Sequence, residues 1–179
     1  MVLPRVSGQV VQMCFIVEDL DKAVGNWITT VGAGPFFVQK DLEGVAVEYR
    51  GISSSLNMDV ALGQAGSLQI ELIRPRGTAP NVYTEMYPHG GTGLHHIASF
   101  VDDLDAEIEA YIVSGQSQAC RGVFGGSSFA YVDTRSTVGI FTELYAESAF
   151  MRGLYSKVAG AAKCWDRSRP IRPLADVIG

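Results

Sequence analysis

Apolar and polar positions along the chain form two successive series of the same kind. Runs in which every second residue is apolar predict strands, and apolar residues three or four positions apart predict helices. A helix that begins at Asp19 has its apolar residues at helical spacing, and Gly32 and Pro35 end it. The predicted elements of the first series are a strand at 10–17, a helix at 19–31 and strands at 36–40, 45–50, 58–62 and 67–73.

A second series follows a connector rich in glycine and proline, which contains one short helical turn around 82–86. Gly115 closes its helix. The segment 123–128 predicts a mobile loop, because it holds two glycines and two serines. The predicted elements are a strand at 94–101, a helix at 103–113, strands at 129–133 and 138–146, and an appended helix at 149–162.

The order of strand, helix and further strands therefore predicts two equivalent modules. We expect a first module at 1–75, a connector at 76–93, a second module at 94–147, and a C-terminal helix and tail at 148–179. The tail is expected either to pack on a neighbouring subunit or to be loose.

Two segments repeat this organisation in detail. Gln12–Asp21 and His96–Asp105 each begin with a polar side chain, continue as an apolar run and end in an Asp-Leu-Asp corner. The first aspartate of each corner can cap the following helix. A chain that repeats itself in this way is built from two equivalent units.

Composition excludes several classes of function. The net charge of −5 and the pI near 5.1 argue against nucleic acid or an anionic membrane as a partner. The three cysteines include no CxxC pair, which is typical of a reducing compartment. No signal peptide is visible, and no apolar run reaches the roughly 18 residues of a membrane span. We therefore expect a cytoplasmic protein with a core built from its 47% hydrophobic residues.

Strand alternation places one strong donor or acceptor on the inner face of four strands. These residues are Gln12, Glu71, His96 and Glu143. An unpaired buried polar group costs about 1–3 kcal/mol, and two carboxylates at equivalent places repel each other. A shared divalent cation would remove both problems. The four residues are therefore predicted to bind Zn²⁺, Ni²⁺, Co²⁺, Mn²⁺ or Fe²⁺ and to leave positions open for water or substrate.

Structural interpretations of the same residues stay open. Gln12 can hydrogen-bond backbone, and the two glutamates can be solvated or form ion pairs with Arg50 or Arg74. His95 and His96 are adjacent, so only one of them can face the interior. Cys14 shares the inner face and is interpreted as a small core residue. Tyr83 is expected either to line the mouth of a cavity or to pack the connector.

Four segments resemble the vicinal oxygen chelate superfamily, which includes glyoxalase I, methylmalonyl-CoA epimerase, extradiol dioxygenases and bleomycin-resistance proteins. They are Gln12–Leu20, Ile70–Pro75, Gly93–Ala98 and Gly139–Leu144, and the resemblance covers about residues 8–147. It implies an α+β fold in which paired βαβββ modules form a curved, barrel-like mixed sheet with helices outside, plus a C-terminal helix.

The resemblance also implies a reaction and its residues. The ligand set is similar to that of some glyoxalase I enzymes, whereas the sequence around His96 is closer to that of methylmalonyl-CoA epimerase. It implies a metal-dependent isomerase, epimerase or lyase that deprotonates a carbon next to a carbonyl through a metal-chelated enolate, with Glu143 or Glu71 as proton acceptor. A further glutamate of the epimerases would fall near Ala46, two residues before Glu48.

Two alternative functions use the same fold. One is a small-molecule binding or resistance protein without catalysis, and the other is an Fe(II) extradiol-type dioxygenase, which needs a His-His-Glu triad. In each case the expected partner is a small molecule with an apolar portion, a carbonyl compound in the favoured interpretation, and a homodimer is expected. The residues predicted to contact the substrate are Ile16, Ile73, Phe100, Phe141 and Tyr145.

Overall fold

The computed structural model describes residues 9–178. Residues 1–8 of the predicted first module, and Gly179, lie outside this range. The elements are β1 (Val10–Ile16), α1 (Leu20–Asn26), η1 (Trp27–Val31), β2 (Phe36–Tyr49), β3 (Ile52–Ala65), β4 (Leu68–Pro75), α2 (Val82–Met86), β5 (Gly93–Val101), α3 (Leu104–Val113), β6 (Ser117–Phe124), β7 (Ser127–Asp133), α4 (Arg135–Val138), β8 (Phe141–Ala146), α5 (Ala149–Lys163), β9 (Ile171–Pro173) and α6 (Ala175–Ile178).

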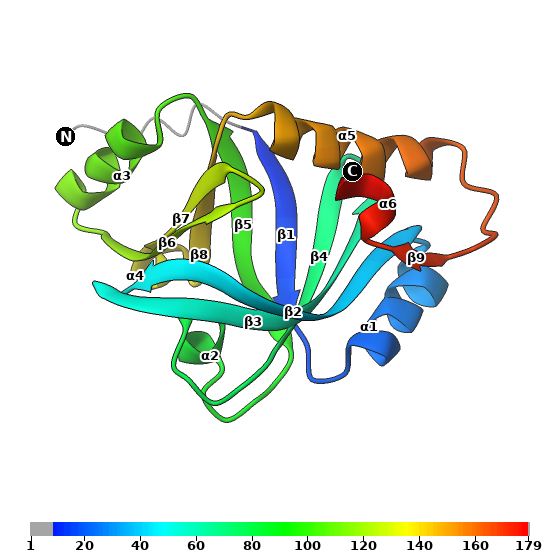
Figure 1. The fold of residues 1–179 in the computed structure, drawn as a ribbon, viewed down its shortest axis with the longest axis horizontal. Coiled ribbons are helices and arrows are strands. Elements are labelled where there is room, and N and C mark those ends of the chain that lie inside the picture. Colours follow the sequence, from blue (N-terminus) through cyan, green and yellow to red (C-terminus); the bar gives the residue numbers. More distant parts are fainter. Residues whose placement is uncertain (1–8, 179) are drawn as a thin grey trace.

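The strands form one mixed sheet that closes into a barrel. Their order is β3-β4-β1-β5-β8-β7-β6-β2, and β2 pairs back onto β3. The two modules meet where β1 and β5 run antiparallel, and a short seam between β2 and β6 closes the other side. Figure 1 shows the curved sheet with α1 and α3 at opposite ends of the molecule. The predicted α+β fold of paired βαβββ modules is confirmed.

The repeated acidic corner begins both outer helices, as predicted. The Asp19 carboxylate accepts a hydrogen bond from the Lys22 backbone N–H at 3.0 Å, and Asp103 accepts one from Ala106 at 3.0 Å. Each bond satisfies a donor that the first turn of a helix leaves free. The first helix continues as the wider-wound η1 to Val31, and Gly32 ends it in the left-handed conformation.

The strands predicted at 36–40 and 45–50 are one strand, β2, with irregular pairing between them. Asp41 and Gly44 take positive φ angles there, 56° and 74°. The buried Asp59 carboxylate accepts the Asp41 N–H at 2.9 Å, so that β3 holds the bend by a side-chain contact. The predicted turn is therefore a bulged region within a continuous strand.

The predicted mobile loop at 123–128 is the tight turn of a hairpin between β6 and β7. Phe124 pairs with Ser127, and both glycines of the turn have positive φ angles. The sequence pattern missed β6 because Ser117–Gly122 lacks an alternation of apolar and polar residues. The strand forms because it pairs with β7 and, at the seam, with β2.

The C-terminal segment packs on its own chain. The predicted helix at 149–162 is present as α5. In the tail, β9 pairs parallel to β2, and the Leu174 N–H donates to Val38 O at 3.0 Å. Leu174 and Val177 are buried in the barrel core. The expectation of a loose tail is therefore wrong for the described residues, because apolar side chains of this tail complete the core, and packing on a neighbouring subunit stays a prediction.

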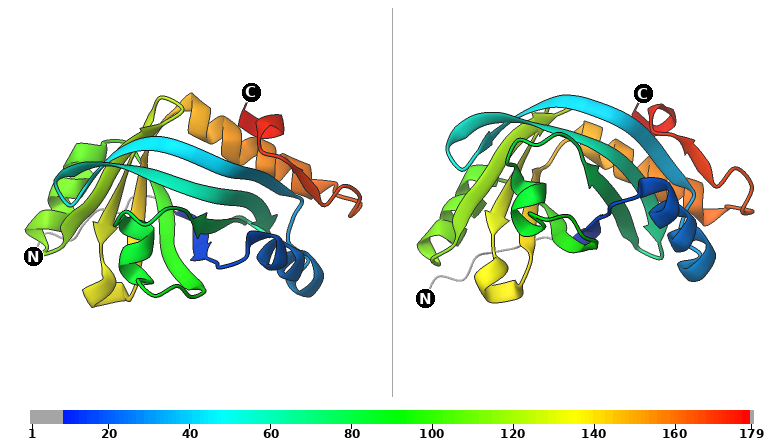
Figure 2. Two further views of the ribbon diagram at one scale, coloured as in Figure 1. Left: turned by 60° about the horizontal axis from the view of Figure 1, so that its bottom comes forward. Right: turned by 90° about the horizontal axis from the view of Figure 1, so that it is seen from below.

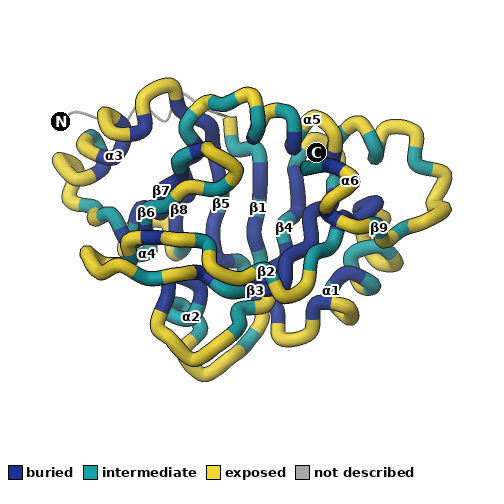
Figure 3. Tube along the Cα trace, viewed as in Figure 1, coloured by how far each residue is buried: buried dark blue, intermediate teal, exposed yellow. Residues whose placement is uncertain are grey.

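Buried residues form one cluster inside the barrel and two outside it, under α1 and under α3. Figure 3 shows the buried central strands and the exposed outer turns. Figure 2 shows α2 from below, beside the lower ends of the central strands. Across residues 9–178, the longest helix is too short and too polar to cross a lipid bilayer.

Candidate metal centre and cavity

Four neighbouring strands, in the order β4, β1, β5 and β8, position the polar interior side chains. Cys14 lies in register with Glu71 on one side and with His96 on the other. Glu143 pairs with Ala98, which is the next residue after His96 on β5 that faces the barrel interior. The small Ala98 side chain lets His96 and Glu143 meet across β5 and β8.

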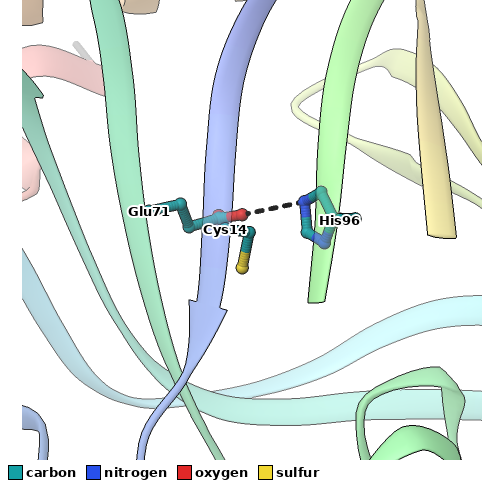
Figure 4. Close-up of side chains that lie close together, drawn as sticks. All are labelled: Cys14, Glu71 and His96. Carbon is teal, nitrogen blue, oxygen red and sulfur yellow. Dashed lines mark ion pairs between the residues drawn. The ribbon is translucent and has the colours of Figure 1, made fainter. Parts of the chain in front are cut away.

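Three of the four predicted ligands converge. The His96 Nε2 atom lies 3.0 Å from Glu143 Oε2 and 3.4 Å from Glu71 Oε2. The side chains of His96, Glu143 and Glu71 are 0%, 3% and 12% exposed. We call these three residues the interior cluster. Figure 4 shows Glu71 of β4 and His96 of β5, the two strands that flank β1, directed at each other, with Cys14 of β1 between them.

The three facing atoms of the interior cluster lack hydrogen-bond partners of good geometry within residues 9–178. Unpartnered buried polar atoms are uncommon, and a group of three that converge is more unusual still. Two carboxylates and one imidazole leave an excess of negative charge unless a cation is present. Nitrogen and carboxylate oxygen are donors that divalent transition metals accept. The residues therefore fit a divalent metal ion.

The neighbouring His95 determines which nitrogen of His96 faces the carboxylates. His95 Nε2 lies 3.0 Å from Val82 O, which can only accept, so His95 Nε2 carries a hydrogen there. A neutral His95 then offers Nδ1 as an acceptor to His96 Nδ1, at 2.9 Å. His96 Nδ1 must therefore carry the donated hydrogen. His96 Nε2 is left to bind a proton or a metal ion, as in other metal sites whose ligand imidazole is held by its second nitrogen.

Electrostatics separate the two adjacent histidines. Burial lowers the pKa of His95 to about 3, and the neighbouring His96 adds to this shift, so His95 is neutral. Burial also opposes a charge on His96, but Glu143 and Glu71 outweigh it and raise its pKa to about 9. Without a metal ion, His96 is therefore protonated at neutral pH.

Gln12 lies in the same cavity, but its amide contacts a different set of groups. Its Nε2 donates to Gln69 Oε1 at 2.7 Å, and its Oε1 accepts from the Tyr145 hydroxyl at 3.5 Å. The structure thus brings Glu71, His96 and Glu143 together and places Gln12 beside them, bonded to Gln69. Ligation by Gln12 remains a proposal that requires its amide to turn.

Cys14 is closer to the interior cluster than its interpretation as a core residue implied. Its Sγ, a Glu71 oxygen and a His96 nitrogen lie within 4.8 Å of one another. Burial and then the Glu71 carboxylate raise the pKa of the Cys14 thiol, which keeps it neutral. The sequence could have indicated this position, because Cys14 follows Gln12 by two residues and therefore lies on the same face of the first strand.

The interior cluster borders a cavity with a volume of about 80 Å³, which is small beside the roughly 300–1,000 Å³ of pockets for drug-sized ligands. Its lining is mostly apolar or aromatic. The lining residues are Gln12, Leu42, Val45, Leu56, Met58, Val60, Leu62, Gln69, Glu71, Tyr83, Phe124, Phe129, Tyr131, Glu143, Tyr145, Met151, Leu154, Tyr155, Leu174 and Ile178.

Of the five predicted substrate contacts, Tyr145 lines this cavity. Ile16, Ile73, Phe100 and Phe141 are buried in the surrounding core and are absent from the lining. They lie on the same face of their strands as the lining residues, at other positions along those strands. Alternation gives the face of a strand and not the height along the barrel, which explains the difference.

Other cavity residues came from segments with weak patterns. Tyr83 lines the cavity and is buried, with its hydroxyl 3.4 Å from that of Tyr131. Glu48, considered as a substitute for an epimerase glutamate, is exposed on the strand face opposite the buried Val47. Strand alternation places Tyr131 on the inward face of its strand, which could have indicated that it lines the cavity. No comparable signal pointed to the cavity residues of the C-terminal segment.

Comparisons with known proteins agree with this architecture. The family model described as "Glyoxalase/Bleomycin resistance protein/Dioxygenase superfamily" matches residues 11–131. The uncharacterized protein YqjC of Bacillus subtilis (strain 168) is 31% identical over 106 residues, which cover 56% of this chain and 74% of that protein.

Solved structures share the fold at low sequence identity. A hypothetical protein from Bacillus halodurans C-125 has a TM-score of 0.60 at 18% identity, over 79% of this chain and 96% of that chain. Methylmalonyl-CoA epimerase from Mycobacterium tuberculosis has a TM-score of 0.53 at 18% identity, over 80% and 90%. The Streptomyces coelicolor epimerase in complex with 2-nitronate-propionyl-CoA has a TM-score of 0.54 at 18% identity, over 79% and 98%.

Proposed function

Since the chain belongs to the Glyoxalase/Bleomycin resistance protein/Dioxygenase superfamily, we propose that it is a divalent-metal enzyme that removes a proton from a carbon next to a carbonyl group. The observation that carries this proposal is the convergence of Glu71 Oε2, His96 Nε2 and Glu143 Oε2 within a buried site where none of the three atoms makes a hydrogen bond of good geometry to a described residue. A structural ion pair would not need a second carboxylate.

Glu71, His96 and Glu143 would hold the ion, and Gln12 would join them if its amide turned away from Gln69. When bound, a divalent cation would act as a Lewis acid and stabilise negative charge that develops on substrate oxygens. His95 would keep His96 oriented through the bond between their Nδ1 atoms. The apolar walls exclude water, so that charges in the cavity interact more strongly than they would in solvent.

The two carboxylates suit an epimerisation. Glu71 comes from β4 and Glu143 from β8, and β1 and β5 lie between these two strands. The carboxylates therefore approach His96 from opposite sides. One, released from or loosely held by the ion, can accept the proton as the C–H bond breaks. The other can return a proton to the opposite face of the same carbon when it is protonated and does not ligate the ion. Isomerisation would instead return the proton to the neighbouring carbon. The epimerases among the structural neighbours favour the first outcome.

The first experiment is metal analysis of protein purified without chelator. We expect about one divalent ion per chain in the wild type. We expect His96→Ala to weaken binding by more than the roughly 10–100-fold typical of losing an outer-shell partner. His89→Ala is the matched control, because His89 is exposed in the connector. Unchanged metal affinity in His96→Ala would exclude the interior cluster as the metal site.

The reaction itself can be followed without knowing the product. Exchange of the α-proton of small carbonyl compounds with deuterium from solvent is visible by NMR. We expect the metal-loaded wild type to catalyse exchange for some member of a panel, and Glu143→Gln to lower the rate by about 10²–10⁴-fold. Exchange by the variant at the wild-type rate would remove Glu143 from the proposed role.

A second candidate is a binding protein without catalysis. The apolar and aromatic lining of the cavity favours it, since such walls suit capture of a hydrophobic ligand. Metal-free protein that binds ligands as well as the metal-loaded protein, and equally well as Glu143→Gln, would support binding over catalysis. The dioxygenase alternative gains no support, because His95 contacts Val82 and leaves one imidazole to face the carboxylates.

A further inference from the structure

The cavity has a second set of unsatisfied polar atoms beyond the interior cluster. Gln69 Nε2 and the Tyr155 hydroxyl are buried and have no hydrogen-bond partner of good geometry within the described range 9–178. Both side chains line the cavity. An amide N–H and a phenol O–H both donate hydrogen bonds, so the two groups share one chemistry. The proposed reaction uses neither of them.

The free donor of Gln69 is fixed by the bond that its amide already makes. Gln69 is 1% exposed, and its Oε1 accepts from Gln12 Nε2 at 2.7 Å. Its Nε2 is therefore the atom left over. Gln69 precedes Glu71 by two positions on β4, so both side chains point into the barrel, with Gln69 one step farther along the strand.

Tyr155 reaches the cavity from α5, which belongs to the C-terminal segment and lies outside the part that matches the family model. The Tyr145 ring packs edge-on against it, with centroids 6.1 Å apart. This segment supplies one wall of the cavity. Its lining residues are Met151, Leu154, Tyr155, Leu174 and Ile178. The wall restricts the cavity to a small ligand.

Gln69 and Tyr155 also border a second hollow. This hollow between α5 and the sheet shares both residues with the cavity and is otherwise lined by groups that include Gln64, Ser156 and Arg152. Arg152 pairs with Glu147 and lies over the Phe100 ring, 3.9 Å from its centroid.

We propose that Gln69 and Tyr155 together bind an acceptor oxygen of the substrate, on the part of the cavity wall where Gln69 lies beside Gln12. This inference rests on the proposed function and narrows its substrate. The substrate is a small compound with neighbouring oxygens that face the metal ligands and a further carbonyl or carboxylate oxygen that reaches Gln69 and Tyr155. Its burial satisfies two donors that otherwise stay unpaired, which is the condition under which a polar site discriminates strongly between ligands.

Binding of hydroxamate probes to metal-loaded protein tests the proposal, measured by calorimetry. Acetohydroxamate supplies two chelating oxygens and nothing more. Longer alkyl hydroxamates that end in a methyl ketone, a carboxylate or a methyl group add a tail of increasing length. We expect the best ketone or carboxylate probe to bind at least about 10-fold more tightly than its methyl-ended equivalent, because it pairs two buried donors. The ketone and carboxylate arms distinguish the two oxygen sources.

The variants Tyr155→Phe and Gln69→Met each remove one donor at nearly constant volume. We expect each to abolish most of the advantage of the oxygen-ended probe and to leave acetohydroxamate affinity and metal content unchanged. Tyr111→Phe is the matched control, because Tyr111 is a buried tyrosine in the separate cluster under α3.

Two failures are distinguishable. Acetohydroxamate binding without any advantage for an oxygen-ended tail, or an advantage that survives in both variants, would overturn the role of Gln69 and Tyr155 and leave the proposed function intact. Wild-type protein that holds no metal ion and binds no hydroxamate would overturn the proposed function and this inference with it.

Discussion

Two groups of charged residues in this barrel differ in how completely they satisfy each other. Arg50, Glu85, Asp133 and Arg135, which we call the rim cluster, join α2 to the ends of β2 and β7. Each acid contacts both arginines, at distances of 2.5–2.7 Å. Two positive and two negative charges balance, and the side chains are partly exposed. The rim cluster needs no further component.

The interior cluster has the opposite character. Its imidazole faces two carboxylates, and the facing atoms of His96, Glu71 and Glu143 make no hydrogen bonds of good geometry to described residues. Burial makes an uncompensated carboxylate far more costly here than at the rim. Full pairing indicates a structural role for the rim, whereas the unbalanced interior indicates a site that a ligand completes.

The largest expected effect is on metal affinity, and it tests whether the interior cluster differs in role from the rim cluster. We expect Glu71→Gln to weaken metal binding by about 10–100-fold or more, because it removes one charged ligand. In metal-free protein the same change should cost little free energy of unfolding, since it leaves one imidazolium facing one carboxylate. Competition with a chromophoric chelator gives the affinity, and urea denaturation gives the stability.

The opposite pair of results would contradict the distinction. If Glu71→Gln left metal affinity unchanged and lowered the stability of the metal-free protein by several kcal/mol, the interior cluster would be a structural ion pair of the same kind as the rim cluster.

The next effect is at the rim and is expected on stability alone. Glu85 is 23% exposed and contacts two arginines. We expect Glu85→Gln to lower the free energy of unfolding by about 1–2 kcal/mol, a value already reduced for solvent screening. Metal affinity should match the wild type. A loss of metal binding in this variant would show that the rim cluster supports the site through α2, where Val82 holds His95.

The comparison also separates what the sequence predicted from what it did not. The repeated Asp-Leu-Asp corners predicted the paired modules. The alternation of side chains along the strands selected three residues that converge, Glu71, His96 and Glu143. These signals are local, and the duplication places the same local pattern twice around one centre. Strand alternation could not show that Gln12 bonds to Gln69, because that contact depends on the register between two strands and on the rotamers of two amides.

The C-terminal segment shows the other limit. Leu174 and Tyr155 reach the cavity because α5, β9 and α6 fold back along the barrel. Their sequence pattern predicts one helix and a tail containing proline, and it holds no information on which part of the protein they cover. Long-range packing of apolar side chains determines that position, and it converts an apparent appendage into a wall of the cavity.

The smallest predicted effect concerns the pH dependence of the rim cluster. Burial opposes ionisation of Glu85, but Arg50, Tyr49 and Arg135 outweigh it and hold its pKa below the ordinary 4.5. A carboxyl whose pKa is depressed by folding stabilises the protein above its unfolded pKa, and this contribution disappears as pH falls through the folded value. The difference in unfolding free energy between wild type and Glu85→Gln should therefore be full at pH 7 and pH 5 and should shrink below about pH 4.5. Urea denaturation at pH 7, 5, 4 and 3 measures it, with the exposed Glu109→Gln as control. A difference that stays constant to pH 3 would mean that Glu85 acts through its shape and hydrogen bonds rather than its charge. Charge pairing would then not explain the stability of the rim cluster, and the contrast with the unbalanced interior cluster would fail.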